Sequence, residues 1–195
     1  MTKLALVAYP LLEEADRQWI ESIRGRHDPQ ASRIAAHFTL VFPVEVAVEP
    51  VVEHTSARLL DARSIRFVLR RAEALPDRLG GGCHVFLVPE EGRDEIVALH
   101  DRLYEGVLLP YLRDDMPFLP HITVGGCGDL GECERLAEAL NGGELTVCGT
   151  VSSIDLVEVR NDDVKTLTTV RLEDCTPSSS EMRRTRPARA SEPRR

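Results

Sequence analysis

The stretch His37-Phe38-Thr39-Leu40 has the pattern histidine, apolar, threonine, apolar, and the pattern returns at His121-Ile122-Thr123-Val124. Each copy lies in an apolar run that is typical of a β-strand. Because successive side chains of a strand point to opposite faces, the histidine and threonine of each copy share one face and the apolar pair shares the other. We therefore expect the polar pairs on a surface and the apolar pairs in a core. Two copies indicate one site built from two equivalent halves.

The two copies occupy the same position in a repeated order of predicted elements. Strands are predicted at residues 4–9, 36–42, 65–71, 83–88, 118–125, 145–159 and 164–172, and helices at 13–26, 50–62, 93–112 and 130–140. The chain is therefore predicted to be α+β, a single bilobal domain of residues 1–175 in which the order β-α-β-α-β occurs twice, at about 1–80 and 81–175. Pro43 is expected to end the strand of the first copy, because proline cannot donate to a sheet ladder.

The charge distribution limits the partners of the chain. Its net charge is −8, which argues against a protein that grips long nucleic acid through the phosphates. Residues 176–195 are rich in Pro, Ser and Arg, and we predict a disordered basic tail there. The remaining body is acidic, so a phosphate-bearing ligand has to be held by a local cationic pocket.

Cysteine usage and hydropathy predict the location of the protein. No apolar run approaches the ~20 residues of a membrane span, and the apolar residues 4–12 are expected to form a strand rather than a signal peptide. The cysteines form no C-x-x-C pair, so reduced thiols in a cytoplasmic protein are predicted. A monomer is expected, because an internally duplicated site needs no second chain. The cysteines are Cys83, Cys127, Cys133, Cys148 and Cys175.

Two histidines in equivalent positions suit displacement at phosphorus. The attacking and leaving oxygens lie on opposite sides of the phosphorus atom, so one group should accept a proton and another should donate one. Histidine holds either role near neutral pH, and the hydroxyls of Thr39 and Thr123 are suited to the non-bridging oxygens. The rival interpretation is a metal site with His37 and His121 as ligands. No carboxylate or cysteine shares the histidine face of the motif strands, so no metal and no other cofactor is predicted.

At these motifs, in AHFTLVFPVE and FLPHITVGG, the sequence resembles the 2H phosphoesterase superfamily, in particular its 2'-5' RNA ligase or LigT-like branch. The resemblance covers residues 1–175 and includes the N-terminal LALVAYP strand. It implies two antiparallel-type sheets, flanked by helices, that face each other across a central cleft. It also implies metal-independent chemistry on 2',3'-cyclic phosphates or 2'-5' phosphodiester bonds. By the same resemblance, His37 and His121 are the acid/base pair and Thr39 and Thr123 hold the phosphate.

We therefore expect a cyclic phosphodiesterase for a small nucleotide or an RNA end, with 2'-5' RNA ligation as the reverse reaction. Which histidine is the base stays open. The alternative is a non-catalytic nucleotide- or RNA-end-binding protein that uses the same cleft. Tyr9 and Phe86 are candidates for stacking on a base, although Tyr9 equally suits a core aromatic with its hydroxyl at the edge. His84 and the remaining histidines are expected outside the site.

One departure from the resemblance concerns charge. Several relatives carry a basic residue directly after the second motif, whereas Gly125 and Gly126 follow it here. A cation at the phosphate therefore has to come from another part of the chain.

Overall fold

The computed structural model describes residues 3–77, 81–113, 115, 117–160 and 163–174, so the predicted tail at 176–195 lies outside the described residues. The elements are β1 (Lys3–Ala8), β2 (Leu11–Leu12), α1 (Glu14–His27), β3 (Phe38–Val44), α2 (Val48–Arg58), β4 (Ile65–Pro76), β5 (Cys83–Glu91), α3 (Arg93–Leu103), the 3-10 helix η1 (Gly106–Tyr111), β6 (Ile122–Cys127), α4 (Leu130–Asn141), β7 (Val147–Val151), β8 (Ser153–Val159) and β9 (Val164–Arg171).

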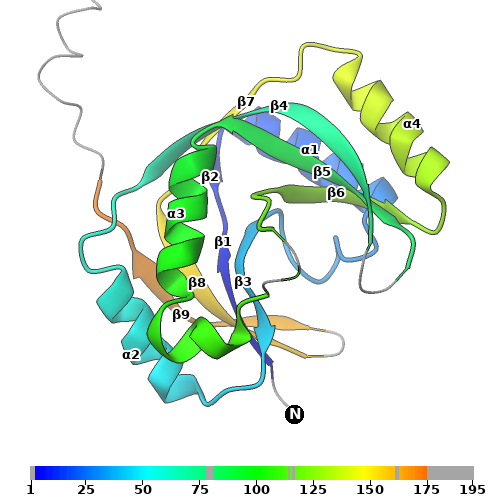
Figure 1. Ribbon diagram of the computed structural model, residues 1–195. Coiled ribbons are helices and arrows are strands. Elements are labelled where there is room, and N and C mark those ends of the chain that lie inside the picture. Colours follow the sequence, from blue (N-terminus) through cyan, green and yellow to red (C-terminus); the bar gives the residue numbers. More distant parts are fainter. Residues whose placement is uncertain (1–2, 78–80, 114, 116, 161–162, 175–195) are drawn as a thin grey trace, which may run out of the picture.

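Within the described residues, the strands form two antiparallel sheets, in the orders β3-β1-β8-β9 and β2-β7-β4-β5-β6 (Figure 1). The predicted α+β class with two antiparallel-type sheets is confirmed. Each sheet takes strands from both halves of the sequence, because β4 pairs with β5 and β8 pairs with β1. Residues 1–80 and 81–175 therefore do not form one sheet each.

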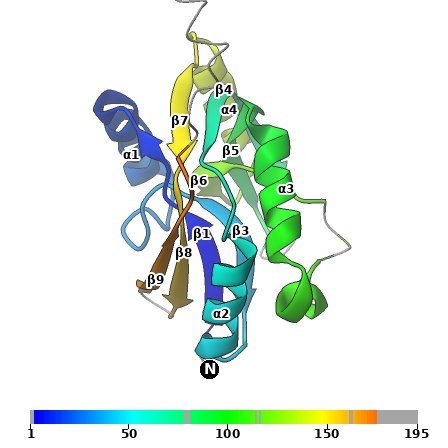
Figure 2. The same cartoon turned by 90° about the vertical axis from the view of Figure 1, so that its left-hand side faces the viewer.

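The helices follow the same reciprocal arrangement. Helix α1, which connects β1 to β3, packs against β6 of the other sheet. Helix α3, on the connection from β5 to β6, contacts β3 in return. Figure 2 shows α1 and α3 on opposite sides of the strands. The two motif strands, β3 and β6, each lie at a sheet edge beside the first strand of their own half, β1 and β5.

The core confirms the predicted alternation along the motif strands. Phe38, Leu40, Ile122 and Val124 have no exposed surface and belong to one apolar cluster that includes residues from both sheets. The Phe38 ring meets the Phe67 ring of the second sheet edge-on, with centroids 5.1 Å apart. Because the apolar faces of both strands are locked into this core, the histidine and threonine faces point away from it. No helix of the described residues is long and apolar enough to cross a membrane.

Several predicted boundaries are wrong. Both motif strands begin later than predicted, β3 at Phe38 and β6 at Ile122. Strand β3 continues through Pro43 to Val44, which an edge strand tolerates because one side of it has no sheet partner. The predicted helix 93–112 is two elements, α3 and η1, separated by Tyr104 and Glu105. η1 begins at Gly106, whose φ of 59° is unfavourable for other residues. The predicted strand 145–159 is β7 and β8, which belong to different sheets and are separated by Ser152.

The prediction that all cysteines are reduced is also wrong. Cys83 and Cys133 form a disulfide, with Cα atoms 6.6 Å apart across a sequence separation of 50. Local spacing rules do not detect such a pair, because the fold brings together β5 and α4. A cytoplasmic location therefore no longer follows from the cysteines.

Candidate active site

The two motif histidines lie directly before the two motif strands, β3 and β6, each of which is at an edge of its sheet. His37 lies directly before β3 and His121 directly before β6, and both side chains are half-buried. Thr39 and Thr123 follow within the strands, also half-buried, on the face opposite the core. The chain thus presents the same pair of side chains at the same place in each sheet.

Both imidazoles make the same hydrogen bond. His37 Nδ1 lies 2.8 Å from the carbonyl oxygen of Ala35, and His121 Nδ1 lies 2.6 Å from that of Leu119. A carbonyl oxygen can only accept, so Nδ1 carries the hydrogen in each ring. The Nε2 atom of each neutral ring is therefore the unprotonated nitrogen, which can take up a proton.

Burial and neighbouring charge favour the neutral form of both histidines. Burial lowers the pKa of His121 to about 4, and the hydrogen bond to Leu119 opposes this shift. Positive charge on His37 or His84 would lower the pKa of His121 further, so these three rings lie within electrostatic reach of one another. Burial also lowers the pKa of His37, against the hydrogen bond to Ala35. Both rings are mostly neutral at pH 7.

Each aromatic residue that was a candidate for base stacking contacts a motif histidine. The Phe86 ring stacks on His121, with centroids 3.8 Å apart and an interplanar angle of 27°. The Tyr9 ring lies 6.1 Å from His37 at 61°, in an edge-on contact. Burial and the charge of Asp155 raise the pKa of Tyr9, while a hydrogen bond with Thr166 lowers it. Tyr9 is therefore half-buried beside the first histidine, with its hydroxyl engaged.

His84 lies at the site, although the sequence pattern predicted it outside. Its ring stacks on Phe86 at a centroid distance of 5.7 Å, so His84, Phe86 and His121 form a row of rings. Its Nε2 atom is 3.5 Å from Asp77 Oδ2. A Cβ atom at Gly126 would lie only 3.0 Å from His84 Nδ1, so the glycine makes room for this imidazole. The signal was present in β5, where buried Cys83, Val85 and Leu87 alternate with His84 and Phe86.

A buried ion cluster lies behind His37. Arg24 is only 1% exposed and pairs with Glu21 at 3.0 Å and with Asp28 at 2.9 Å. Arg24 also donates to the carbonyl oxygen of Ile34 at 2.7 Å, and Glu21 accepts from the backbone N–H of Ala36 at 2.7 Å. The cluster therefore ties helix α1 to the loop that ends at His37. An arginine in a helix is usually a solvated residue, so the sequence alone did not indicate this cluster.

Metal-ligating side chains gather elsewhere. Of the residues that the structure describes, those grouped closely enough to hold a metal ion are Cys83, Cys127 and Cys133. His37 and His121 are not part of that group.

Comparisons with known proteins show a family and a shared fold. The sequence model of the 2'-5' RNA ligase superfamily matches residues 12–163. A protein of Bacillus licheniformis that is named as a phosphoesterase is 27% identical over 128 residues, which are 63% of this chain and 69% of that protein. E. coli LigT, solved with 3'-AMP, has a similar fold, with a TM-score of 0.53 and 20% identity over 88% of this chain and 98% of LigT. TT0787 of Thermus thermophilus has a TM-score of 0.55 and 17% identity over 89% of this chain and all of its own (100%).

The ion cluster yields a stability prediction. Arg24→Met should lower the free energy of unfolding by about 3–5 kcal/mol, because it leaves two carboxylates near a buried position without their cation. The matched control is Arg17→Met, which removes an exposed pair with Glu14 on the same helix and should change stability little. Urea denaturation of both variants measures the difference. Equal midpoints for the two variants would show that the cluster does not hold the loop.

Proposed function

This chain belongs to the 2'-5' RNA ligase superfamily, and we propose that it is a metal-independent phosphoesterase for 2',3'-cyclic phosphate or 2'-5' phosphodiester bonds of nucleotides or RNA ends. The observation that carries the proposal is the matched pair His37 and His121, each with Nδ1 bound to the carbonyl two residues before it. The phosphoesterase relative supports the reaction class. The 3'-AMP and ATP bound to E. coli LigT support a substrate of nucleotide size.

In this mechanism the two histidines take unlike roles. His121, with its pKa of about 4, is the general base, because it stays unprotonated and can accept the proton of the attacking water at Nε2. His37 is the general acid and donates a proton to the departing ribose O3', which gives a 2'-phosphate product. A bound phosphate raises the pKa of nearby histidines through its negative charge, so binding of the substrate favours protonated His37. In the ligation direction a ribose hydroxyl takes the place of water.

The residues around the histidines have supporting roles in the proposal. Thr39 and Thr123 donate their hydroxyls to the non-bridging oxygens, where negative charge is stabilised. Phe86 stacks on His121 and holds that ring in position. Tyr9 remains the candidate for base stacking, because its contact with His37 is edge-on rather than stacked.

A substrate panel tests the reaction and its metal independence. Wild-type protein should turn over 2',3'-cyclic nucleotides or 2'-5'-linked oligonucleotides equally with and without EDTA. His37→Ala and His121→Ala should each lower kcat by about 10²–10⁴-fold, which is the usual contribution of a general acid or base. The matched control is His54→Gln, a histidine bonded to the Leu103 carbonyl away from the motif strands, which should keep wild-type activity.

Two other outcomes of the substrate panel would count against the proposal. Binding without turnover across all substrates would favour the non-catalytic binding protein. Turnover that both histidine variants retain would contradict the proposed mechanism.

The lowered pKa values predict the pH dependence of the rate. As pH rises through about 4, His121 loses its proton and becomes a competent base. As pH rises through the lowered pKa of His37, the acid loses its proton and kcat/KM falls. We expect a bell-shaped kcat/KM profile with its maximum below about pH 6.5, the ordinary pKa of histidine. A kcat/KM that is flat from pH 5 to 9, or that rises throughout this range, would contradict histidine acid/base chemistry.

His84 is proposed as the cationic group that Gly125 and Gly126 do not supply. Its ring lies against Gly126, and a positive charge on this ring would act on His121. His84→Gln should therefore raise KM for a phosphate substrate about tenfold, with little change in kcat. An equal loss in kcat would instead indicate disruption of the ring stack, and an unchanged KM would remove His84 from substrate binding.

A further inference from the structure

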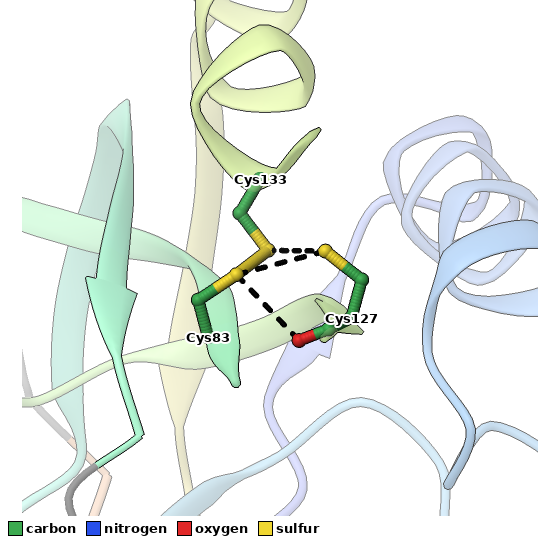
Figure 3. A group of neighbouring side chains, drawn as sticks. All are labelled: Cys83, Cys127 and Cys133. Carbon is green, nitrogen blue, oxygen red and sulfur yellow. Dashed lines mark hydrogen bonds between the residues drawn. A yellow bond between two sulfur atoms is a disulfide. The ribbon is translucent and has the colours of Figure 1, made fainter. Parts of the chain in front are cut away.

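Three cysteines that are distant in sequence meet at one end of β5 and β6 (Figure 3). Cys83 begins β5, Cys127 ends β6, and Cys133 lies near the start of α4. Their sulfur atoms all lie within 4.8 Å of one another. Besides the Cys83–Cys133 disulfide, Cys127 Sγ is 2.9 Å from Cys133 Sγ and 3.6 Å from Cys83 Sγ.

The surroundings favour a built site rather than a disulfide alone. Cys83 and Cys133 are each 1% exposed, and Cys127 is half-buried, so the cluster is enclosed but reachable through Cys127. The carbonyl oxygen of Asp129 accepts from the Cys127 thiol at 3.1 Å and lies 3.2 Å from Cys83 Sγ. A disulfide uses two sulfurs and has no need of a third one aimed at the same point. Figure 3 shows that the three side chains converge from three separate elements.

We propose that the reduced cluster of Cys83, Cys127 and Cys133 binds one thiophilic d¹⁰ cation of the Zn²⁺ type. Soft thiolate ligands select Zn²⁺ and Cu⁺ over the hard cations. Binding removes one proton from each of the three thiols and moves no electrons. Three protein ligands leave the fourth tetrahedral position of Zn²⁺ to water or to an external thiol.

The disulfide is the metal-free state of the same cluster. A low-molecular-weight disulfide converts Cys83 and Cys133 into their disulfide and leaves as two thiols, which carry away the two electrons and two protons. Two of the three ligands are then lost. The site therefore binds the cation only when it is reduced.

The cation would join the end of β6 to β5 and α4. Cys127 lies on the strand that carries Thr123, so the site holds the strand of the second motif without touching the histidines. The metal site is independent of the phosphoesterase proposal. EDTA can therefore act on the stability of the protein without acting on the reaction, and Cys127→Ser separates the two effects.

Titration of the full chain with Cd²⁺ tests the site. The protein is reduced with dithiothreitol, desalted without oxygen and titrated, and thiolate-to-Cd²⁺ charge-transfer absorption is followed. The wild type should bind one equivalent. The matched control Cys148→Ser/Cys175→Ser keeps only the three cluster cysteines and should bind one equivalent with the same affinity. Cys127→Ser, or Cys127→Ala if the serine variant does not fold, should lose affinity at least about tenfold.

Two further measurements complete the test. Zn²⁺ should raise the Tm of the reduced wild type and of the control but not of the Cys127 variant, because only a ligand of the native state stabilises it. Wild type first oxidised with glutathione disulfide, with the Cys83–Cys133 bond confirmed by peptide mass mapping, should bind no Cd²⁺. Reduced wild type that takes up no Cd²⁺, oxidised protein that binds as well as reduced protein, or a folded Cys127 variant with wild-type affinity would each overturn the site.

Discussion

The exchange of strands between the two halves of the chain is the constraint on which the rest of the structure depends. β4 leaves the first half to pair with β5, and β8 returns to pair with β1. Helices α1 and α3 are exchanged in the same way, because α1 packs against the motif strand β6 and α3 packs against the motif strand β3. Neither half can complete its sheet or cover its apolar face without the other. The positions of the two motif strands are therefore set by one shared core.

That shared core produces a symmetric site with unequal surroundings. Both histidines hold the same tautomer through a carbonyl two residues before them. His121 stacks on Phe86, however, whereas His37 has an edge-on contact with the Tyr9 ring and lies near the charges of the Arg24 cluster. In-line displacement needs one group that accepts a proton and one that donates it. The duplicated fold supplies two imidazoles in matched positions, and the rings beside them differ.

The features that sequence predicted are those that local periodicity encodes. The alternation in the two motifs placed Phe38 and Ile122 in the core, because a strand has a period of two. Membership of the sheets could not be predicted in this way. The break at Ser152, which sends β7 and β8 to different sheets, depends on partners far away in the chain. The burial of Arg24 and the cluster of three cysteines could not be predicted for the same reason. Both depend on contacts between elements that no local sequence pattern specifies.

The two glycines after the second motif show how packing and chemistry are linked in β6. A Cβ atom at Gly125 would lie 2.9 Å from Leu136 Cδ2 of α4, and one at Gly126 would lie 3.0 Å from His84 Nδ1. A side chain at either position would therefore push α4 or His84 away from the strand. The close approach of α4 also brings Cys133 to Cys127 at the end of β6. Glycine at these two positions therefore leaves β6 without a basic side chain after the motif. It also permits the close packing that places the His84 imidazole against β6 and brings three cysteine sulfurs together at the end of this strand.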